Sequence, residues 1–180
     1  NALFYRQKMG LLDYDERMAI LLQEVQGERH GDYFFPTLAG VGFSYNPFRW
    51  TSKIRREDGF VRLVWGMGTR AVDRLSNDYA RMVALSHPNL RPVVGAPQLR
   101  RYSQHYVDVI NLAQNEFQTL PATDLLSMDY PAARYLVSVD RGDYIQAPMA
   151  YDPSLSPQDL VLTFENLLTR TRFVPLMKTI

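Results

Sequence analysis

The chain has 180 residues and 46% of them are hydrophobic, so it is long enough to bury the core of one domain or of two small lobes. It has no cysteine, which excludes disulfides, thiolate nucleophiles and cysteine-bound metals and makes the cytoplasm the default compartment. Its 20 basic and 19 acidic residues give a net charge of +1, which does not favour a nucleic-acid partner. No signal peptide is visible and no apolar run reaches the roughly eighteen residues of a membrane span, so we expect no membrane partner.

The first part of the chain is predicted to hold a short helix and two strands. Residues 3–10 have the composition of a short helix. Met18–Gln23 contains a continuous apolar run between polar neighbours, which is typical of a strand covered on both faces. A polar loop over 26–32 leads to a second strand at 40–44, whose glycines indicate that another backbone or a ligand lies close.

The sharpest local pattern runs from Ile54 to Asp73. Asp58-Gly59 is a turn, Phe60–Trp65 is an apolar strand, and Gly66-Met67-Gly68 is a corner that leads into a helix. The backbone amides of such a corner can approach a phosphate, but a lone G-x-G is also found at plain strand-to-helix corners. The pattern alone therefore favours the plain corner.

Beyond the corner, the apolar spacing allows two interpretations. It fits one helix over 69–84, or a short helix over 69–75 followed by a strand over 81–85. We favour the second, because Ser76-Asn77-Asp78 is a natural break in a helix. The proline-containing stretch 89–98 is predicted to be a linker.

The second half of the chain reads as strands followed by a helix. Residues 102–112 and 117–120 are predicted to form a hairpin through Gln114-Asn115, and 134–139 is predicted to be a strand that turns into 144–146.

The last predicted element is a helix that begins at Ser156. Ser156 is a natural N-cap, Pro157 suits the first helical position, and Asp159 complements the positive end of the helix dipole. Pro175 is expected to end or kink the helix. Its apolar face consists of Leu160, Val161, Phe164, Leu167 and Leu168.

Three phrases resemble the nucleotide-binding domain of the phosphoenolpyruvate synthase and pyruvate phosphate dikinase family, which is an ATP-grasp fold. Met18–Val25 resembles the family's strand ending in V-Q-x-M-V, Gly40–Pro47 resembles G-V-x-F-[ST]-x-N-P, and Trp65–Gly68 resembles W-G-L-G. The match is dense from about Met18 to Val72. It implies an α+β, ATP-grasp-like domain with an antiparallel or mixed sheet and flanking helices.

The resemblance also implies a function. The family's domain binds Mg-ATP and phosphorylates a histidine on a separate domain, and that histidine then phosphorylates pyruvate in a third domain. On this basis the partners are ATP and the phosphohistidine and pyruvate/phosphoenolpyruvate domains of the same protein. The implied nucleotide-binding positions are Gln23, Glu24 and Val25, whose backbone reads the adenine edge, and Gly66, Gly68, Thr69 and Arg70 at the corner, where Arg70 is the preferred phosphate ligand.

The chain departs from the family in ways that lead us to expect a piece of a longer protein. Thr69 stands where the family has Glu, and the family's metal-binding D-I-E-[WF] and its Q-x-R strand do not occur. Residues 1–90 would be the core segment, and 91–180 the continuation of the same domain. We therefore expect ATP and Mg to bind only in the complete domain, with no catalytic or metal-binding residue in this chain, which alone should bind ATP weakly or not at all.

Other functions are less well supported. His30, His87 and His105 are scattered, which does not indicate a metal site. Ser86-His87 lacks the glycine-rich context of the family's phosphorylated histidine. Two alternatives stay open: a degenerate relative that serves as a scaffold or regulatory module, favoured by Thr69, and a β-rich interaction module that uses the aromatic and basic loop Phe48–Arg56.

Overall fold

The computed structural model of the protein describes residues 2–15, 17–73, 77–128, 130–150, 152 and 154–179. The strands are β1 (Glu28–His30), β2 (Tyr33–Phe35), β3 (Ala39–Phe43), β4 (Phe60–Val64), β5 (Arg81–Ala84), β6 (Tyr106–Asn111), β7 (Glu116–Pro121), β8 (Val137–Asp140), β9 (Ile145–Gln146) and β10 (Leu160–Leu162). The helices are α1 (Ala2–Lys8), α2 (Thr69–Val72), α3 (Ala96–Arg101), α4 (Ala122–Leu126), α5 (Ala133–Leu136), α6 (Glu165–Arg170) and α7 (Phe173–Met177), with 3-10 turns at Arg56–Asp58 and Pro157–Asp159.

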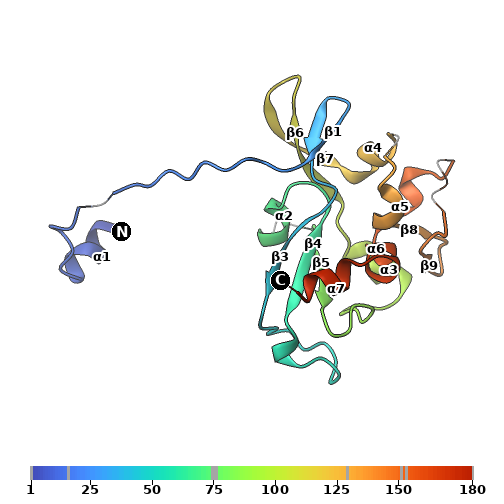
Figure 1. The fold of residues 1–180 in the computed structure, drawn as a ribbon, viewed down its shortest axis with the longest axis horizontal. Coiled ribbons are helices and arrows are strands. Elements are labelled where there is room, and N and C mark those ends of the chain that lie inside the picture. Colours follow the sequence, from blue (N-terminus) through green and yellow to red (C-terminus); the bar gives the residue numbers. More distant parts are fainter. Residues whose placement is uncertain are drawn as a thin grey trace.

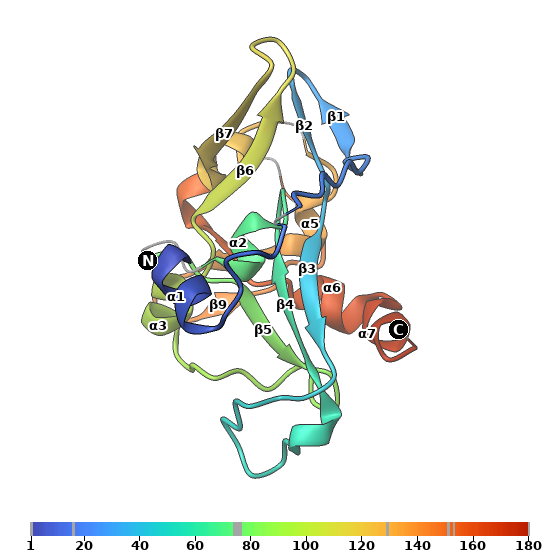
Figure 2. The same cartoon turned by 90° about the vertical axis from the view of Figure 1, so that its left-hand side faces the viewer.

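The strands form antiparallel sheets ordered β1-β2-β6-β7, β3-β4-β5 and β10-β8-β9, with short helices between them (Figure 1). The architecture is therefore α+β, as the sequence predicts. Figure 2 shows α2 at the junction of the β6-β7 hairpin and the β3-β4-β5 sheet. No helix in the described ranges is both long and apolar enough to span a bilayer.

The N-terminal tract differs from the prediction. Helix α1 confirms the helix expected over residues 3–10, but the strand predicted at Met18–Gln23 is wrong: residues 17–27 have no regular secondary structure. Met18 is 95% exposed and Leu22 is 89% exposed, and Figure 1 shows the tract leading away from the sheets. An apolar run becomes a strand only where a neighbour accepts its backbone hydrogen bonds, and no sheet in the described residues does so.

The β3-β4-β5 sheet confirms the strands predicted around the corner. It also supports the short helix followed by a strand, since α2 and β5 are separate elements; Leu75 and Ser76, on which part of that prediction rests, lie outside the described residues. At Gly40, an added Cβ would lie 2.4 Å from the carbonyl oxygen of Arg62 on β4. The close neighbour predicted from the strand glycines is therefore the adjacent backbone.

The four-stranded sheet contains the predicted β6-β7 hairpin, in which Asn115 has a φ of 53°. The polar loop predicted over 26–32 is wrong in part, because β1 lies within it and pairs with β2. Phe35 of β2 packs beside Trp65 and Tyr130, with ring centroids 5.9 and 5.8 Å away. These three rings belong to the larger hydrophobic core of the molecule.

The C-terminal third departs most from the prediction. The strand expected over 134–139 begins as α5 and becomes extended only from Val137. The long helix expected from Ser156 is wrong. Ser156 Oγ accepts a hydrogen bond from the Gln158 amide, but it caps only a 3-10 turn, and β10 then pairs with β8.

The chain becomes helical again only at α6, after Phe164 adopts a φ of 57°. The apolar spacing of Leu160–Leu162 suits a helix or a strand, and in the structure these residues pair with β8. Pro175 does not end or kink a helix as expected. It lies in the first turn of α7, where a backbone N–H has no partner within the helix, so the N–H that proline lacks costs nothing. The linker predicted over 89–98 ends earlier than expected, because α3 starts at Ala96.

Candidate functional site

The Trp65–Gly68 corner is pressed against strand β6. Gly66 has a φ of 85°, and a Cβ at this position would lie 2.7 Å from the carbonyl oxygen of Asp108 and 2.4 Å from Val107 Cγ1. The Met67 amide donates to the same Asp108 oxygen at 2.9 Å. Glycine is thus required here for both its backbone conformation and its lack of a side chain.

A buried glutamine joins the corner to the segment that precedes β6. Gln104 Oε1 accepts a hydrogen bond from the Trp65 amide at 2.8 Å, and Gln104 Nε2 donates to the Trp65 carbonyl at 2.8 Å and to the Tyr106 carbonyl at 2.7 Å. The side-chain amide therefore pairs with the Trp65 backbone as a neighbouring strand would. This holds the end of β4 in place.

Below the corner, a polar cluster is centred on Arg70, which is only 9% exposed. Its Nε donates to Asp108 Oδ1 at 3.0 Å and its Nη1 donates to Asp78 Oδ2 at 2.6 Å. Asp108 also accepts from the hydroxyls of Thr69 at 2.5 Å and Thr119 at 2.6 Å. One guanidinium thus neutralises two buried carboxylates. The two hydroxyls also donate to Asp108, and the His105 amide donates to Asp78 Oδ1.

This arrangement gives two corner residues structural partners. The Arg70 guanidinium is engaged by Asp78 and Asp108 and links α2, β6 and the segment before β5, while its expected contact with a phosphate stays a prediction. Thr69 donates to Asp108, and a glutamate in its place would bring another carboxylate to this buried acid. The departure from the family pattern therefore has a local physical cause.

A cavity of about 410 Å³ lies beside the cluster, lined by Asn77, Tyr79, Arg101, His105 and Tyr106. The Tyr106 ring connects the polar cluster to the cavity, since it lines the cavity and its centroid lies 5.5 Å from the Arg70 guanidinium carbon. The cavity is large enough for a nucleotide. It offers two aromatic faces together with the guanidinium of Arg101 and the imidazole of His105.

The structure brings together only part of the predicted nucleotide site. Gly66, Gly68, Thr69 and Arg70 lie at one corner, with Gly68 and Thr69 exposed. The segment Gln23–Val25 lies in the exposed N-terminal tract and is not packed against them. Both the adenine contact from this segment and the phosphate contact from the corner therefore stay predictions.

Sequence reasoning missed the partners of the corner. Gln104, Asp108 and Thr119 lie 38 to 49 residues after the corner residues that they contact, Asp78 lies eight residues after Arg70, and no short motif connects them. One signal was present: Asp108 interrupts the apolar strand around it, and an acid in such a run is expected to have a buried partner.

The described residues do not fit a magnesium ion. No group of three or more histidine or acidic residues in them is placed to hold a metal, and Asp78 and Asp108 are already paired with Arg70. No chemical step is therefore assigned to a metal held by these residues.

Ser86-His87 lies in a separate polar group near the Asp58 turn. Ser86 Oγ donates to Asp58 Oδ2 at 2.7 Å and lies 2.9 Å from His87 Nδ1. The carboxylate contacts the serine rather than the histidine, so the three residues do not have the order of a catalytic triad. Hydrogen bonds from Ser86 and from the Arg55 amide lower the pKa of Asp58 to about 2.

This shift predicts how acid affects stability. Asp58 has a lower pKa in the folded protein than its ordinary 3.8, so its ionised form stabilises the fold above about pH 4, and this contribution is lost as pH falls toward 2. We expect Asp58→Asn to lower the free energy of unfolding at neutral pH and to flatten its dependence on pH between 2 and 4. Urea unfolding at several pH values measures both effects. Ser86→Ala should give a smaller change of the same kind, and an unchanged slope in Asp58→Asn would contradict the assignment.

Comparison with known proteins agrees with the resemblance found in the sequence. No curated protein and no solved structure is significantly similar to the chain. A family model described as pyruvate phosphate dikinase, AMP/ATP-binding domain, matches residues 1–133, a span that contains the corner, the polar cluster and the cavity beside them. Because this model covers well over half of the sequence, the chain belongs to the family of the AMP/ATP-binding domain of pyruvate phosphate dikinase.

Proposed function

We propose that the chain is part of the ATP-binding domain of a multidomain phosphotransferase similar to phosphoenolpyruvate synthase and pyruvate phosphate dikinase. In this proposal the complete protein uses Mg-ATP to phosphorylate a histidine on another domain, and the phosphoryl group then passes to pyruvate. The observation that carries the proposal is the family match over residues 1–133. The cavity beside the corner supplies a place for the nucleotide.

Within that cavity, Arg101 is the proposed phosphate contact in place of Arg70. Among the residues that the structure describes, Arg101 has no carboxylate partner. Its guanidinium carbon lies 5.6 Å from the Tyr102 ring centroid, and it lines the cavity together with His105. Tyr79 and Tyr106 present aromatic faces on which a purine can stack. Arg70, buried against Tyr106, is then a positioning residue that fixes the cavity wall.

The exposed tract explains why the chain alone should bind weakly. If the backbone of Gln23–Val25 reads the adenine edge, the tract must first pack against the corner, and ordering those residues costs free energy. The described residues also supply no metal cluster. We therefore expect a Kd for Mg-ATP near 1 mM, equivalent to about −4 kcal/mol, and no phosphoryl transfer by this chain alone.

Isothermal titration calorimetry with Mg-ATP and with AMP tests the proposal. Arg101→Met should weaken binding several-fold, because it removes the cation but keeps a similar side-chain length. Arg29→Met, which changes the same charge on exposed β1, should bind like the unmodified chain. Tight, Mg-dependent binding by the 180-residue chain would contradict the predicted weakness.

The full-length protein separates the enzyme from its main rival. ATP-dependent phosphorylation of a histidine, detected as acid-labile phosphate, supports the phosphotransferase. If neither the chain nor the full-length protein binds ATP or AMP, the domain serves as a scaffold or regulatory module, the alternative that Thr69 favours.

A further inference from the structure

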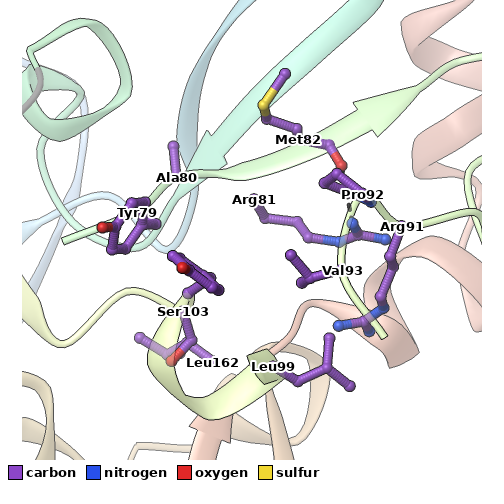
Figure 3. A pocket seen from close by; sticks show the side chains of 11 residues that line it. Tyr79, Ala80, Arg81, Met82, Arg91, Pro92, Val93, Leu99, Ser103 and Leu162 are labelled. Atoms are coloured by element: carbon purple, nitrogen blue, oxygen red, sulfur yellow. Dashed lines mark hydrogen bonds between the residues drawn. The ribbon is translucent and has the colours of Figure 1, made fainter. Parts of the chain in front are cut away.

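A second cavity, of about 160 Å³, lies between β5, α3, β10 and the segment that connects β5 to α3 (Figure 3). Tyr79 lines both this cavity and the nucleotide cavity. The floor is formed by the buried residues Arg81, Ser103 and Leu162, and Pro92 is exposed at the rim. The cavity is too small for a nucleotide.

Arg81 is the unusual feature of this cavity. It is 9% exposed, and its Nη1 and Nη2 donate to the carbonyl oxygens of Met82 at 2.8 Å and Pro88 at 3.2 Å. Its Nε is buried without a hydrogen-bond partner. In the part of the chain that the structure describes, no carboxylate forms an ion pair with it.

A buried guanidinium held only by carbonyl groups is energetically unfavourable. Burial lowers the pKa of Arg81 to about 9, and Arg91 adds to this effect while Glu165 opposes it. Arg91 itself pairs with Glu165, so these two charges cancel and leave the charge of Arg81 unbalanced. One negative charge in the cavity would restore the balance.

The rest of the lining indicates what carries that charge. Figure 3 shows Arg81 extending past Val93 toward Pro92 and Arg91. Most of the exposed lining is apolar, and the Tyr79 and Tyr102 rings meet edge to face with centroids 5.0 Å apart. A phosphate or sulfate ion would leave this apolar surface uncovered, whereas a small organic anion covers it.

We propose that this cavity binds a small organic carboxylate with an apolar body, whose carboxylate accepts hydrogen bonds from the Arg81 guanidinium while its hydrocarbon part packs on Val93, Leu99 and Leu162. The site is separate from the proposed nucleotide contact at Arg101. Its occupant would bind through one carboxylate and a few apolar contacts.

Isobutyrate is the probe for the test, with inorganic phosphate as the polar comparison, both at constant ionic strength and pH 7. Binding is followed by NMR chemical shifts of the intact chain and by thermal melting. We expect isobutyrate to shift the amide signals around Arg81 and to raise the melting temperature. Arg81→Met should weaken isobutyrate binding at least ten-fold.

Three further variants make the result specific. Arg29→Met removes an equal charge on β1, outside the cavity, and Arg101→Met removes the proposed nucleotide contact; both should bind isobutyrate normally. Val93→Phe fills the cavity while keeping the charge of Arg81, and should abolish binding. Arg81→Met exchanges a buried charge for an apolar side chain of similar length, so it should fold, which circular dichroism checks.

Several results would overturn the proposal. These are no saturable isobutyrate binding, equal binding by wild type and Arg81→Met, or tighter binding of phosphate than of isobutyrate. Loss of ATP binding in Arg101→Met with isobutyrate binding intact would show that the nucleotide site and the carboxylate site are independent.

Discussion

Replacing Gly66 with alanine should destabilise the protein by roughly 3 kcal/mol. A left-handed backbone costs a non-glycine residue about 1–2 kcal/mol, and forcing a methyl group into a packed contact costs about 1–3 kcal/mol. Here the new Cβ would meet the Asp108 carbonyl oxygen at 2.7 Å, and backbone cannot move aside as a flexible side chain can. For a chain of this length, 3 kcal/mol lowers the melting temperature by about 6–12 °C.

Gly42→Ala is the matched control. Gly42 lies on β3, has no atom within 4 Å of the position of a Cβ, and does not have a positive φ. Its replacement should change the free energy of unfolding by less than about 0.5 kcal/mol. Differential scanning calorimetry of the two variants measures the contrast. Equal melting temperatures would show that the corner is not pressed against β6 as described.

Replacing Arg70 with methionine should cost about 3–5 kcal/mol, because it leaves Asp78 and Asp108 buried without their cation. Urea denaturation of the variant and of the unmodified chain at neutral pH measures this loss.

A compensating variant tests the cause. Changing Asp78 and Asp108 to asparagine together with Arg70→Met removes the charges and keeps side chains of similar size. It should recover part of the lost stability, since no uncompensated charge is then buried. If the triple variant is less stable than Arg70→Met alone, hydrogen-bond geometry rather than charge holds the cluster together.

The sequence predicted the parts of the fold that local residues decide. The strand Phe60–Val64, the Gly66–Gly68 corner and the β6-β7 hairpin each carry their own turn residues, so neighbouring positions suffice to define them. The prediction of a long final helix was wrong because Leu160–Leu162 suits a helix or a strand, and only pairing with Val137–Val139 decides between them. That pairing is not visible in the local spacing.

The candidate site was predictable only in outline. The family phrases predicted a site at the Gly66–Gly68 corner, which stays a prediction, and the pairing of Arg70 with Asp108 was not predictable, because Asp108 lies 38 residues further along the chain. The prediction for Met18–Gln23 was wrong for a related reason. A run of hydrophobic residues favours burial, but it does not show which part of the chain would pack against it. Both errors concern contacts between distant parts of the sequence.

The separation of the corner from its partners also has a consequence for the order of events on the ribosome. Trp65 receives its side-chain partner from Gln104, 39 residues later, and Arg70 receives one of its acids from Asp108. A nascent chain that has emerged only as far as β5 therefore exposes an unpaired strand end and a cation without this acid. The β3-β4-β5 sheet should thus become fully native only after β6 has been synthesised, which delays its protection from aggregation.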